Sequence, residues 1–418
     1  MSDPPHHRGS LGVLYPRVRR HLLAIVLGPA VLAAGPAGAQ AYDGDDLRAK
    51  LSREMRLAGA SSGALVRDLE SGVTLYERRA DGRRVPASVE KLFTTSTVLL
   101  RLGSGGTLAT RVMTDGTLGL DGVLRGDVYL VGGGDPTLTG GHLKRLAQRL
   151  TIQGVQAIEG RVHGDESLFD GRRGGPRTRF GFDGYMGGVL SAVAYRRGFS
   201  DRLSPPVDAA DRFAAYLRLA GIAVPAGGRA GVAPPDAQEI ARVASPTMRD
   251  MAAMVNGASD NFAAEMLFKA LGARFGSGGT HAAGQRVVRD EMRGLGLTPS
   301  ISDGSGLSRA NRTTPRQVVR LFEQMAERPD EGMALRASLP VAGRSGTLTR
   351  RMRGTPAERS CRAKTGTLNG VSSLAGMCMT RAGDDVAFAF LLNGVNTTSA
   401  KRIEDRMAAA IARVDEEL

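Results

Sequence analysis

The strongest local constraint on folding in this 418-residue chain is the dipeptide Asn369-Gly370. Asn-Gly between two strand-like runs is typical of a two-residue β-hairpin turn. The flanking runs AKTGTL and VSSLAGM favour strands. Cys361 lies eight residues before Asn369, and Cys378 lies eight residues after Gly370. The turn therefore predicts that these two cysteines face each other, either as a disulfide in an oxidising compartment or as two buried free thiols.

Helix-like and strand-like segments at both ends of the chain enclose a middle part of different texture. Before residue 104, SGALVRDLESGVTLYERRAD predicts a two-strand hairpin and SVEKLFTTSTVLLRLG predicts a helix. After residue 236 the sequence predicts further helices, the buried strand VAFAFLLNGV and a last helix from about Ser399 that packs on a sheet. The middle part is β-like with frequent turns and two helices. We expect one α/β domain formed by residues 42–104 and 236–418, interrupted by a smaller inserted domain at 105–235.

The first 39 residues have the order of features that is typical of a secretory signal peptide. Three arginines precede an apolar run at 22–34, and small residues follow at 37–39. A transmembrane anchor is the alternative, although the apolar run is short and contains Gly28 and Pro29. The pattern predicts export across the inner membrane and a soluble periplasmic protein after removal of residues 1–39.

The net charge of +14 makes this chain strongly basic. Such a charge favours an anionic polymer or a membrane surface as a peripheral partner, and an arginine-rich solvated surface is an equally good interpretation. Nucleic acid is disfavoured, because tryptophan is absent, aromatic residues make up 5% and no basic stripe alternates with stacking rings.

Three short motifs occur in order along the chain: Ser88-Val89-Glu90-Lys91, Ser259-Asp260-Asn261 and Lys364-Thr365-Gly366. Each motif is a weak signal alone. Together they gain weight, because only six of the 56 basic residues are lysines and two of those six are Lys91 and Lys364. The same set of motifs is known from penicillin-binding proteins and class A β-lactamases.

The residue types in these motifs suit nucleophilic catalysis by a serine. A serine hydroxyl needs a base that takes its proton, and Lys91 lies one helical turn from Ser88, where the two side chains can touch. Lys91 acts as that base if burial and the second cation at Lys364 lower its pKa. The alternative base is a histidine, but His142, His163 and His281 have no recognisable triad context.

The other two motifs provide groups that hold a substrate. Ser259 can relay a proton to a leaving amine, and Asn261 can hold a substrate amide and the lysine head. The strand that begins at Lys364 can pair edge-on with an extended peptide, where a backbone N–H at Gly366 and that of Ser88 form an oxyanion hole. Lys364 and the hydroxyls of Thr365 and Thr367 suit a substrate carboxylate.

With these residues the sequence resembles the class C low-molecular-mass penicillin-binding proteins, the D-alanyl-D-alanine carboxypeptidases and endopeptidases of peptidoglycan remodelling. The resemblance spans most of the chain after the signal. It includes the segments GVLRGDVYLVGGGDPTLT, VHGDESLF, SDGSGLSRANRTTP, LPVAGRSGTLTRRMRGTP and RAKTGTLNGVSSLAG.

What the resemblance implies about fold and activity is concrete. The fold is a penicillin-binding/β-lactamase-like transpeptidase domain of the α/β (α+β) class, with a five-stranded antiparallel sheet flanked by helices. Ser88 attacks the carbonyl of a D-Ala-D-X stem peptide of peptidoglycan, Lys91 is the base, and water then cleaves the acyl-enzyme. β-Lactams acylate Ser88, and the resulting acyl-enzyme is hydrolysed slowly. The family needs no metal and no cofactor.

Two other functions remain open from the sequence: a serine β-lactamase or esterase on the same scaffold, and a non-catalytic wall-binding protein. Class A β-lactamases need a glutamate on a loop after S-D-N, where this chain carries SDGSGLSR, and the acidic candidates Glu265 and Glu291 lie in helix-like sequence. Only 171 residues separate Ser88 from Ser259. That interval is shorter than in the larger family members, so one inserted domain is expected to be reduced or missing.

Overall fold

The computed structural model describes residues 41–200 and 204–417. The signal peptide predicted at 1–39 lies outside the described residues. Within these described ranges, no helix is both long enough and apolar enough to span a bilayer.

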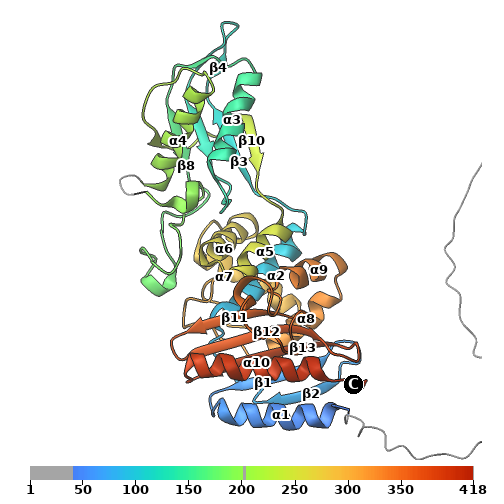
Figure 1. Cartoon of the computed structure of the whole chain (residues 1–418). Helices are drawn as coiled ribbons and strands as arrows, with labels where there is room; N and C mark the ends of the chain where they lie inside the picture. The colour runs from blue at the N-terminus through green and yellow to red at the C-terminus, as the bar shows by residue number, and fades with distance from the viewer. Residues whose placement is uncertain (1–40, 201–203, 418) are drawn as a thin grey trace, which may run out of the picture. The chain divides into compact units, whose positions relative to one another are not determined.

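The first sheet joins the beginning and the end of the described chain (Figure 1). Its five strands are all antiparallel and have the order β11-β12-β13-β1-β2. Their bounds are β1 Gly63–Asp68, β2 Thr74–Arg78, β11 Cys361–Leu368, β12 Val371–Met379 and β13 Asp385–Asn393. The sheet confirms the predicted fold class, and it leaves β11 at one edge.

The hairpin β11–β12 has the register that the Asn369-Gly370 turn predicts. Leu368 pairs with Val371, and Cys361 pairs with Cys378 at the far end. The two cysteines form a disulfide with their Cα atoms 4.0 Å apart, so the alternative of two free thiols is wrong. Both are fully buried in the core beneath the last helix.

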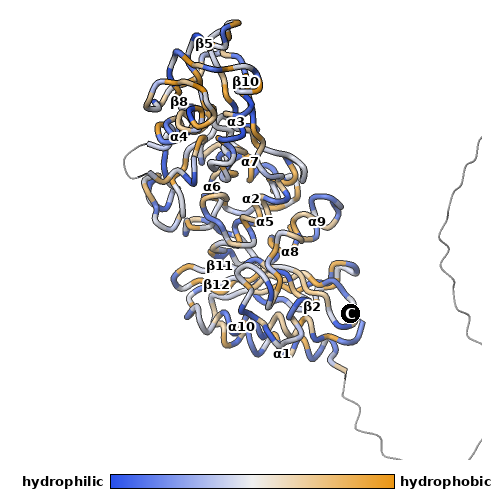
Figure 2. The backbone as a smooth tube through the Cα atoms, turned by 45° about the horizontal axis from the view of Figure 1, so that its top comes forward, coloured by the Kyte–Doolittle hydropathy of each residue, from blue (hydrophilic) through white to orange (hydrophobic). Residues whose placement is uncertain are grey.

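Helices cover both faces of this sheet (Figure 1). On one face lie α1 (Gly44–Leu57) and α10 (Thr397–Arg413), which contact each other and along which hydrophobic and hydrophilic residues alternate (Figure 2). The predicted last helix therefore packs on the sheet as expected. It begins two residues before Ser399, because the Asn396 side chain caps it by accepting from the N–H groups of Thr398 and Ser399.

On the other face, α8 contacts β13 and β1, and further helices pack behind it around a second part of the core. The bounds on this side are η1 Ala87–Glu90, α2 Lys91–Leu102, α5 Met248–Gly257, α6 Asn261–Phe275, α7 His281–Gly294, α8 Pro315–Ala326 and α9 Pro329–Ser338. The short η4 (Gly346–Leu348) instead adds Leu348 to the core under α1 and α10. The predicted helix after Pro86 is thus a short 3₁₀ segment that continues directly into α2. The predicted break at Ser259-Asp260-Asn261 separates α5 from α6.

A second five-stranded sheet, of mixed direction, has the order β10-β3-β6-β8-β9, and a three-stranded sheet β4-β5-β7 accompanies it. The bounds are β3 Ala109–Thr114, β4 Thr117–Leu118, β5 Val123–Arg125, β6 Val128–Val131, α3 Gly140–Ile152, β7 Ala157–Ile158, β8 Val162–Asp165, η2 Pro176–Thr178, η3 Tyr195–Gly198, α4 Pro205–Leu219, β9 Arg229–Ala230 and β10 Gln238–Ala244. Helices α3 and α4 share a separate core with this sheet. The domain boundaries at 105 and 235 stay a prediction, and we propose that the second one lies nearer Ala244, because β10 pairs with β3.

Candidate active site

Ser88 and Lys91 lie next to each other at the start of α2. Side chains three residues apart eclipse each other in a 3₁₀ helix, and Ser88 belongs to the 3₁₀ segment that ends just before Lys91. The Lys91 Nζ atom lies 3.0 Å from Ser88 Oγ. Ala87 holds a positive φ of 48°, a sparsely populated conformation for a residue with a Cβ. The contact predicted between the serine and the lysine is confirmed.

Two further contacts orient the amine of Lys91. Its Nζ donates to Asn261 Oδ1 at 2.7 Å and to the carbonyl oxygen of Ser305 at 2.5 Å. Both partners are acceptors only, so a neutral amine spends its two N–H groups on them. Its lone pair then faces Ser88, in the position to take the hydroxyl proton.

Burial and the neighbouring carboxylates shift the pKa of Lys91 in opposite directions. Burial lowers the pKa of Lys91 from 10.5 to about 8, although the carboxylates of Asp303, Glu265, Asp260 and Glu90 all raise it. Burial thus lowers the pKa of Lys91 as predicted. The pKa of Lys364 falls well below its usual range, through burial and then through the charge of Lys91, because two buried ammonium groups disfavour each other's charge.

A buried Glu265–His281 pair supports the peptide that binds the Lys91 amine. Glu265 accepts from the Ser305 N–H at 2.8 Å, and its other oxygen lies 3.1 Å from His281 Nε2. Glu265 and Ser305 are fully buried and His281 is 4% exposed. Because Ser305 offers its carbonyl to Lys91, the Glu265–His281 pair fixes the peptide that holds the amine. His281 thus has a role in the structure, and this role is not that of a base on Ser88.

Ser259 and Asn261 stand at the break between α5 and α6. Ser259 adopts a positive φ of 58°, and its Oγ accepts from Lys364 Nζ at 2.9 Å. Asn261 places its Oδ1 on Lys91, as expected, and its Nδ2 donates to the Tyr185 carbonyl at 2.7 Å. The Asp260 side chain caps α6.

Arg197 from the middle part of the chain clamps Asp260. Its guanidinium donates to both carboxylate oxygens, at 2.7 and 2.8 Å, and lies over the Phe262 ring. Burial alone would raise the pKa of Asp260, but the hydrogen bonds and charge of Arg197 outweigh it and lower that pKa. Bidentate Arg–carboxylate pairs are among the most geometrically specific contacts in proteins. This clamp holds the S-D-N turn in place from outside its own helices.

The edge strand β11 has its last residues open for pairing. Cys361 and Cys378 are a close pair that exchanges no ladder hydrogen bonds, because their Cα atoms are only 4.0 Å apart. Odd-numbered residues therefore turn their backbone groups to the edge, and Ala363 accordingly donates to the Pro340 carbonyl at 2.9 Å. By the same alternation Thr365 and Thr367 point their N–H groups outward.

This alternation corrects the predicted oxyanion hole. The N–H of Gly366 points into the hairpin, whereas the outward N–H beside Ser88 belongs to Thr367. Gly366 is still required for the approach, because a Cβ added there would lie 3.0 Å from Ser88 N and 2.6 Å from the Pro86 carbonyl oxygen. The hydroxyl of Thr365 donates to Thr347 Oγ1 at 2.8 Å.

A pocket of about 820 Å³ opens over these groups. It is lined by Ser88, Arg177, Tyr185, Ser259, Asn261, Leu307, Ser308, Arg309, Ala310, Thr367, Leu368 and Asn369. Lys91 and Lys364 are fully buried behind Ser88 and Ser259. All eight predicted residues thus belong to one neighbourhood: four line the pocket, the two lysines contact lining serines, and Thr365 and Gly366 connect them along β11.

Sequence reasoning missed several residues of this site. Tyr185 and Arg177 come from the Gly-rich passage at 171–206, and the Arg177 guanidinium stacks on the Tyr185 ring and pairs with Asp183 at 2.6 Å. Ser305 lies in SDGSGLSR, a segment that the resemblance had already singled out. Nothing in the local sequence marks the Glu265–His281 pair or Arg197.

Comparison with known proteins decides the family. The family model of the D-Ala-D-Ala carboxypeptidase 3 (S13) family matches residues 45–180 and 187–414. This chain belongs to that family. Its members are serine peptidases, so the chain is a serine-type D-Ala-D-Ala carboxypeptidase.

Relatives agree along most of the chain. A D-alanyl-D-alanine carboxypeptidase of an Actinomadura species is 30% identical, over 94% of this chain and 89% of the relative. A carboxypeptidase of Mycolicibacterium smegmatis is 29% identical, over 83% and 79% of the two chains. Among solved structures, penicillin binding protein 4 of Haemophilus influenzae shares the fold with a TM-score of 0.72 at 22% identity, covering 85% of this chain and 97% of that one.

Proposed function

We propose that this carboxypeptidase cleaves D-Ala-D-Ala stem peptides of peptidoglycan in the periplasm, with Ser88 as the nucleophile and Lys91 as its base. The observation that carries the proposal is the orientation of the Lys91 amine. Its Nζ lies 3.0 Å from Ser88 Oγ and also contacts two pure acceptors, Asn261 Oδ1 and the Ser305 carbonyl, so the neutral amine directs its lone pair at Ser88. The name of the Actinomadura relative supports the substrate class.

Acylation then follows from the contacts. Lys91 takes the proton of Ser88, and Ser88 Oγ bonds to the carbonyl carbon of the scissile D-Ala-D-Ala bond. The oxyanion that forms accepts hydrogen bonds from the backbone N–H groups of Ser88 and Thr367. The substrate backbone lies along the open edge of β11 as an added strand.

Collapse of the tetrahedral intermediate breaks the C–N bond and releases D-alanine. The leaving nitrogen takes a proton from the Ser259 hydroxyl, which Lys364 contacts at 2.9 Å. The proton that Lys91 took from Ser88 then replaces the one that Ser259 gave up. Water then attacks the acyl carbonyl and returns Ser88. With a cross-linked stem peptide the same steps release the neighbouring strand instead of D-alanine.

Slow loss of a β-lactam acyl group follows from the composition of the pocket. None of its twelve described lining residues is Asp or Glu. Glu265 is buried against His281 and Ser305, and Glu291 pairs with Arg101. No carboxylate in this pocket is placed to activate the deacylating water, which disfavours the β-lactamase alternative. A Bdellovibrio bacteriovorus endopeptidase of the same fold, at 18% identity and a TM-score of 0.51, is described as penicillin G acylated.

The test is D-alanine release from a synthetic stem peptide, run beside cleavage of a cross-linked dimer. We expect Lys91→Arg to remove both activities, since an arginine cannot give up its proton. Lys401→Arg, in α10, is the matched control and should keep full activity. Turnover by the Lys91→Arg protein would refute the base role, and a wild-type protein that releases neither product would refute the substrate.

A further inference from the structure

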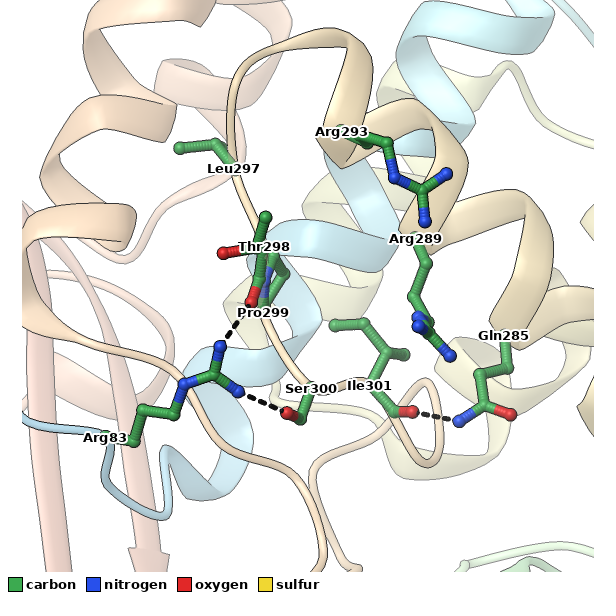
Figure 3. A pocket seen from close by; sticks show the side chains of 9 residues that line it. All are labelled: Arg83, Gln285, Arg289, Arg293, Leu297, Thr298, Pro299, Ser300 and Ile301. Carbon is green, nitrogen blue, oxygen red and sulfur yellow. Dashed lines mark hydrogen bonds between the residues drawn. The ribbon is translucent and has the colours of Figure 1, made fainter.

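A second pocket, separate from the one over Ser88, lies beside α7 (Figure 3). Its volume is about 290 Å³. It is lined by Arg83, Gln285, Arg289, Arg293, Leu297, Thr298, Pro299, Ser300 and Ile301. Three of the nine are arginines, none is acidic, and none belongs to the catalytic pocket.

One helix face supplies two of the arginines. Gln285, Arg289 and Arg293 are four residues apart along α7, so they form one row on its surface (Figure 3). Like charges at this spacing repel each other. Arg293 pairs with Asp290 at 2.6 Å, but both side chains are about 60% exposed, which makes the pair weak. The side chain of Arg289 makes no hydrogen bond or ion pair with any residue in the described ranges.

Arg83 supplies the third positive charge from the segment before η1. Its guanidinium donates to Ser300 Oγ at 2.8 Å and to the Thr298 carbonyl at 3.4 Å, and to no carboxylate of the described chain. Gln285 holds the same 297–301 segment from the other side, through the Ile301 carbonyl (Figure 3). The walls of the pocket are therefore tied together, while two of its three guanidiniums, those of Arg83 and Arg289, pair with no carboxylate of the described chain.

We propose that this pocket binds the phosphate group of a phosphate ester. The planar, forked guanidinium matches phosphate oxygens with paired hydrogen bonds, and an anion in this cavity would relieve the repulsion among three guanidiniums of which only Arg293 has a weak, exposed carboxylate partner. The hydroxyls of Thr298 and Ser300 offer additional donors. Water occupies about 30 Å³ per molecule in the liquid, so 290 Å³ accommodates a phosphate and part of the group that it esterifies.

The pocket lies between α7 and two segments that lead to the active site, so a bound anion would connect them. The 297–301 segment continues into Ser305, whose carbonyl holds Lys91, and Arg83 lies five residues before Ser88. An anion that bridges Arg83 with Arg289 and Arg293 fastens α7 to both segments. We therefore expect a phosphate ester to raise the unfolding temperature of the protein.

The test is calorimetric titration of the mature protein, at fixed ionic strength, with glycerol 3-phosphate, with a polyglycerol phosphate polymer and with acetate. We expect saturable binding of the phosphate compounds at one site. The double variant Arg289→Ala/Arg293→Ala should weaken that binding by about tenfold or more. Arg286→Ala, on the same helix but outside the pocket, should change it less than about twofold.

Each outcome is informative. Binding of the monoester indicates a small soluble ligand, and binding of the polymer alone indicates an anionic polymer. Both results support the site if the double variant weakens the binding by about tenfold or more. Equal weakening by Arg286→Ala would show general attraction to a basic surface and overturn the proposal. So would the absence of saturable binding, or preferential binding of acetate. Unchanged benzylpenicillin acylation of the variants shows that they are folded.

Discussion

Replacing Gly366 by alanine tests the close approach between β11 and Ser88. The new Cβ would lie 2.6 Å from the Pro86 carbonyl oxygen and 3.0 Å from Ser88 N, where ordinary contact begins at 3.4 Å. The strand must retreat from Pro86 by the difference between 3.4 and 2.6 Å, about 0.8 Å. Because Gly366 has no positive φ, the alanine itself fits the strand backbone.

A shift of this size moves the Thr367 N–H out of the 2.7–3.1 Å range that an oxyanion donor needs. Losing one such donor, or misplacing a reacting group by about 1 Å, typically lowers the rate by about 10²-fold or more. We expect Gly366→Ala to slow benzylpenicillin acylation by about 10²-fold, and overpacking to lower the free energy of unfolding by about 1–3 kcal/mol.

The assay is the second-order rate constant of acylation, measured beside a denaturant unfolding curve. Thr367→Ser is the matched control, because it keeps the backbone N–H and a hydroxyl, and its rate should stay within about threefold of wild type. A Gly366→Ala protein that is folded and acylated within threefold of wild type would refute the assignment of the oxyanion hole.

Three further predictions concern the groups around this site. The acylation rate should rise with pH through about 8 as Lys91 loses its proton. Glu265→Gln removes a charge that raises the pKa of Lys91, so it should move the midpoint of this profile to lower pH by roughly half a unit to one unit. An unchanged or higher midpoint would contradict the role of Glu265 in setting that pKa. Arg197→Ala should lower the free energy of unfolding by about 1.5–3 kcal/mol, through loss of charged hydrogen bonds, and should slow acylation. The double variant Arg197→Ala/Asp260→Asn should recover part of the stability, because no unpaired carboxylate remains. If the single and the double variant lose the same free energy of unfolding, the clamp is contradicted. Cys361→Ala/Cys378→Ala should lower the free energy of unfolding by about 2–4 kcal/mol and leave the acylation rate of the folded protein unchanged; an unaltered denaturation midpoint would refute a stabilising disulfide.

Local signals in the sequence predicted much of the fold. The Asn369-Gly370 turn determines the β11–β12 register by itself, because a two-residue loop leaves one way to pair the strands. Apolar periodicity and the break at Ser259 likewise separate α5 from α6 without help from distant residues. Each of the three motifs thus lies in the element that the sequence predicts for it.

The missed features depend on contacts between distant segments. Arg197 and Asp260 are 63 residues apart, and Lys91 and Ser305 are 214 apart, so no local pattern predicts either contact. The charge of Lys91 depends on buried acids that surround it in space, and only the pairing direction of β11 assigns the outward N–H to Thr367. The pairing of β10 with β3 is similarly invisible in the local sequence.

The most direct test of Ser88 as a nucleophile activated by Lys91 is mass spectrometry of the mature protein after incubation with benzylpenicillin, followed by mapping of the adduct. We predict one long-lived penicilloyl adduct on Ser88, absent from the Ser88→Ala protein. An adduct on another residue would contradict the assignment of the nucleophile. Rapid hydrolysis of the antibiotic without any accumulating adduct would contradict the slow deacylation that a pocket without acidic lining residues predicts.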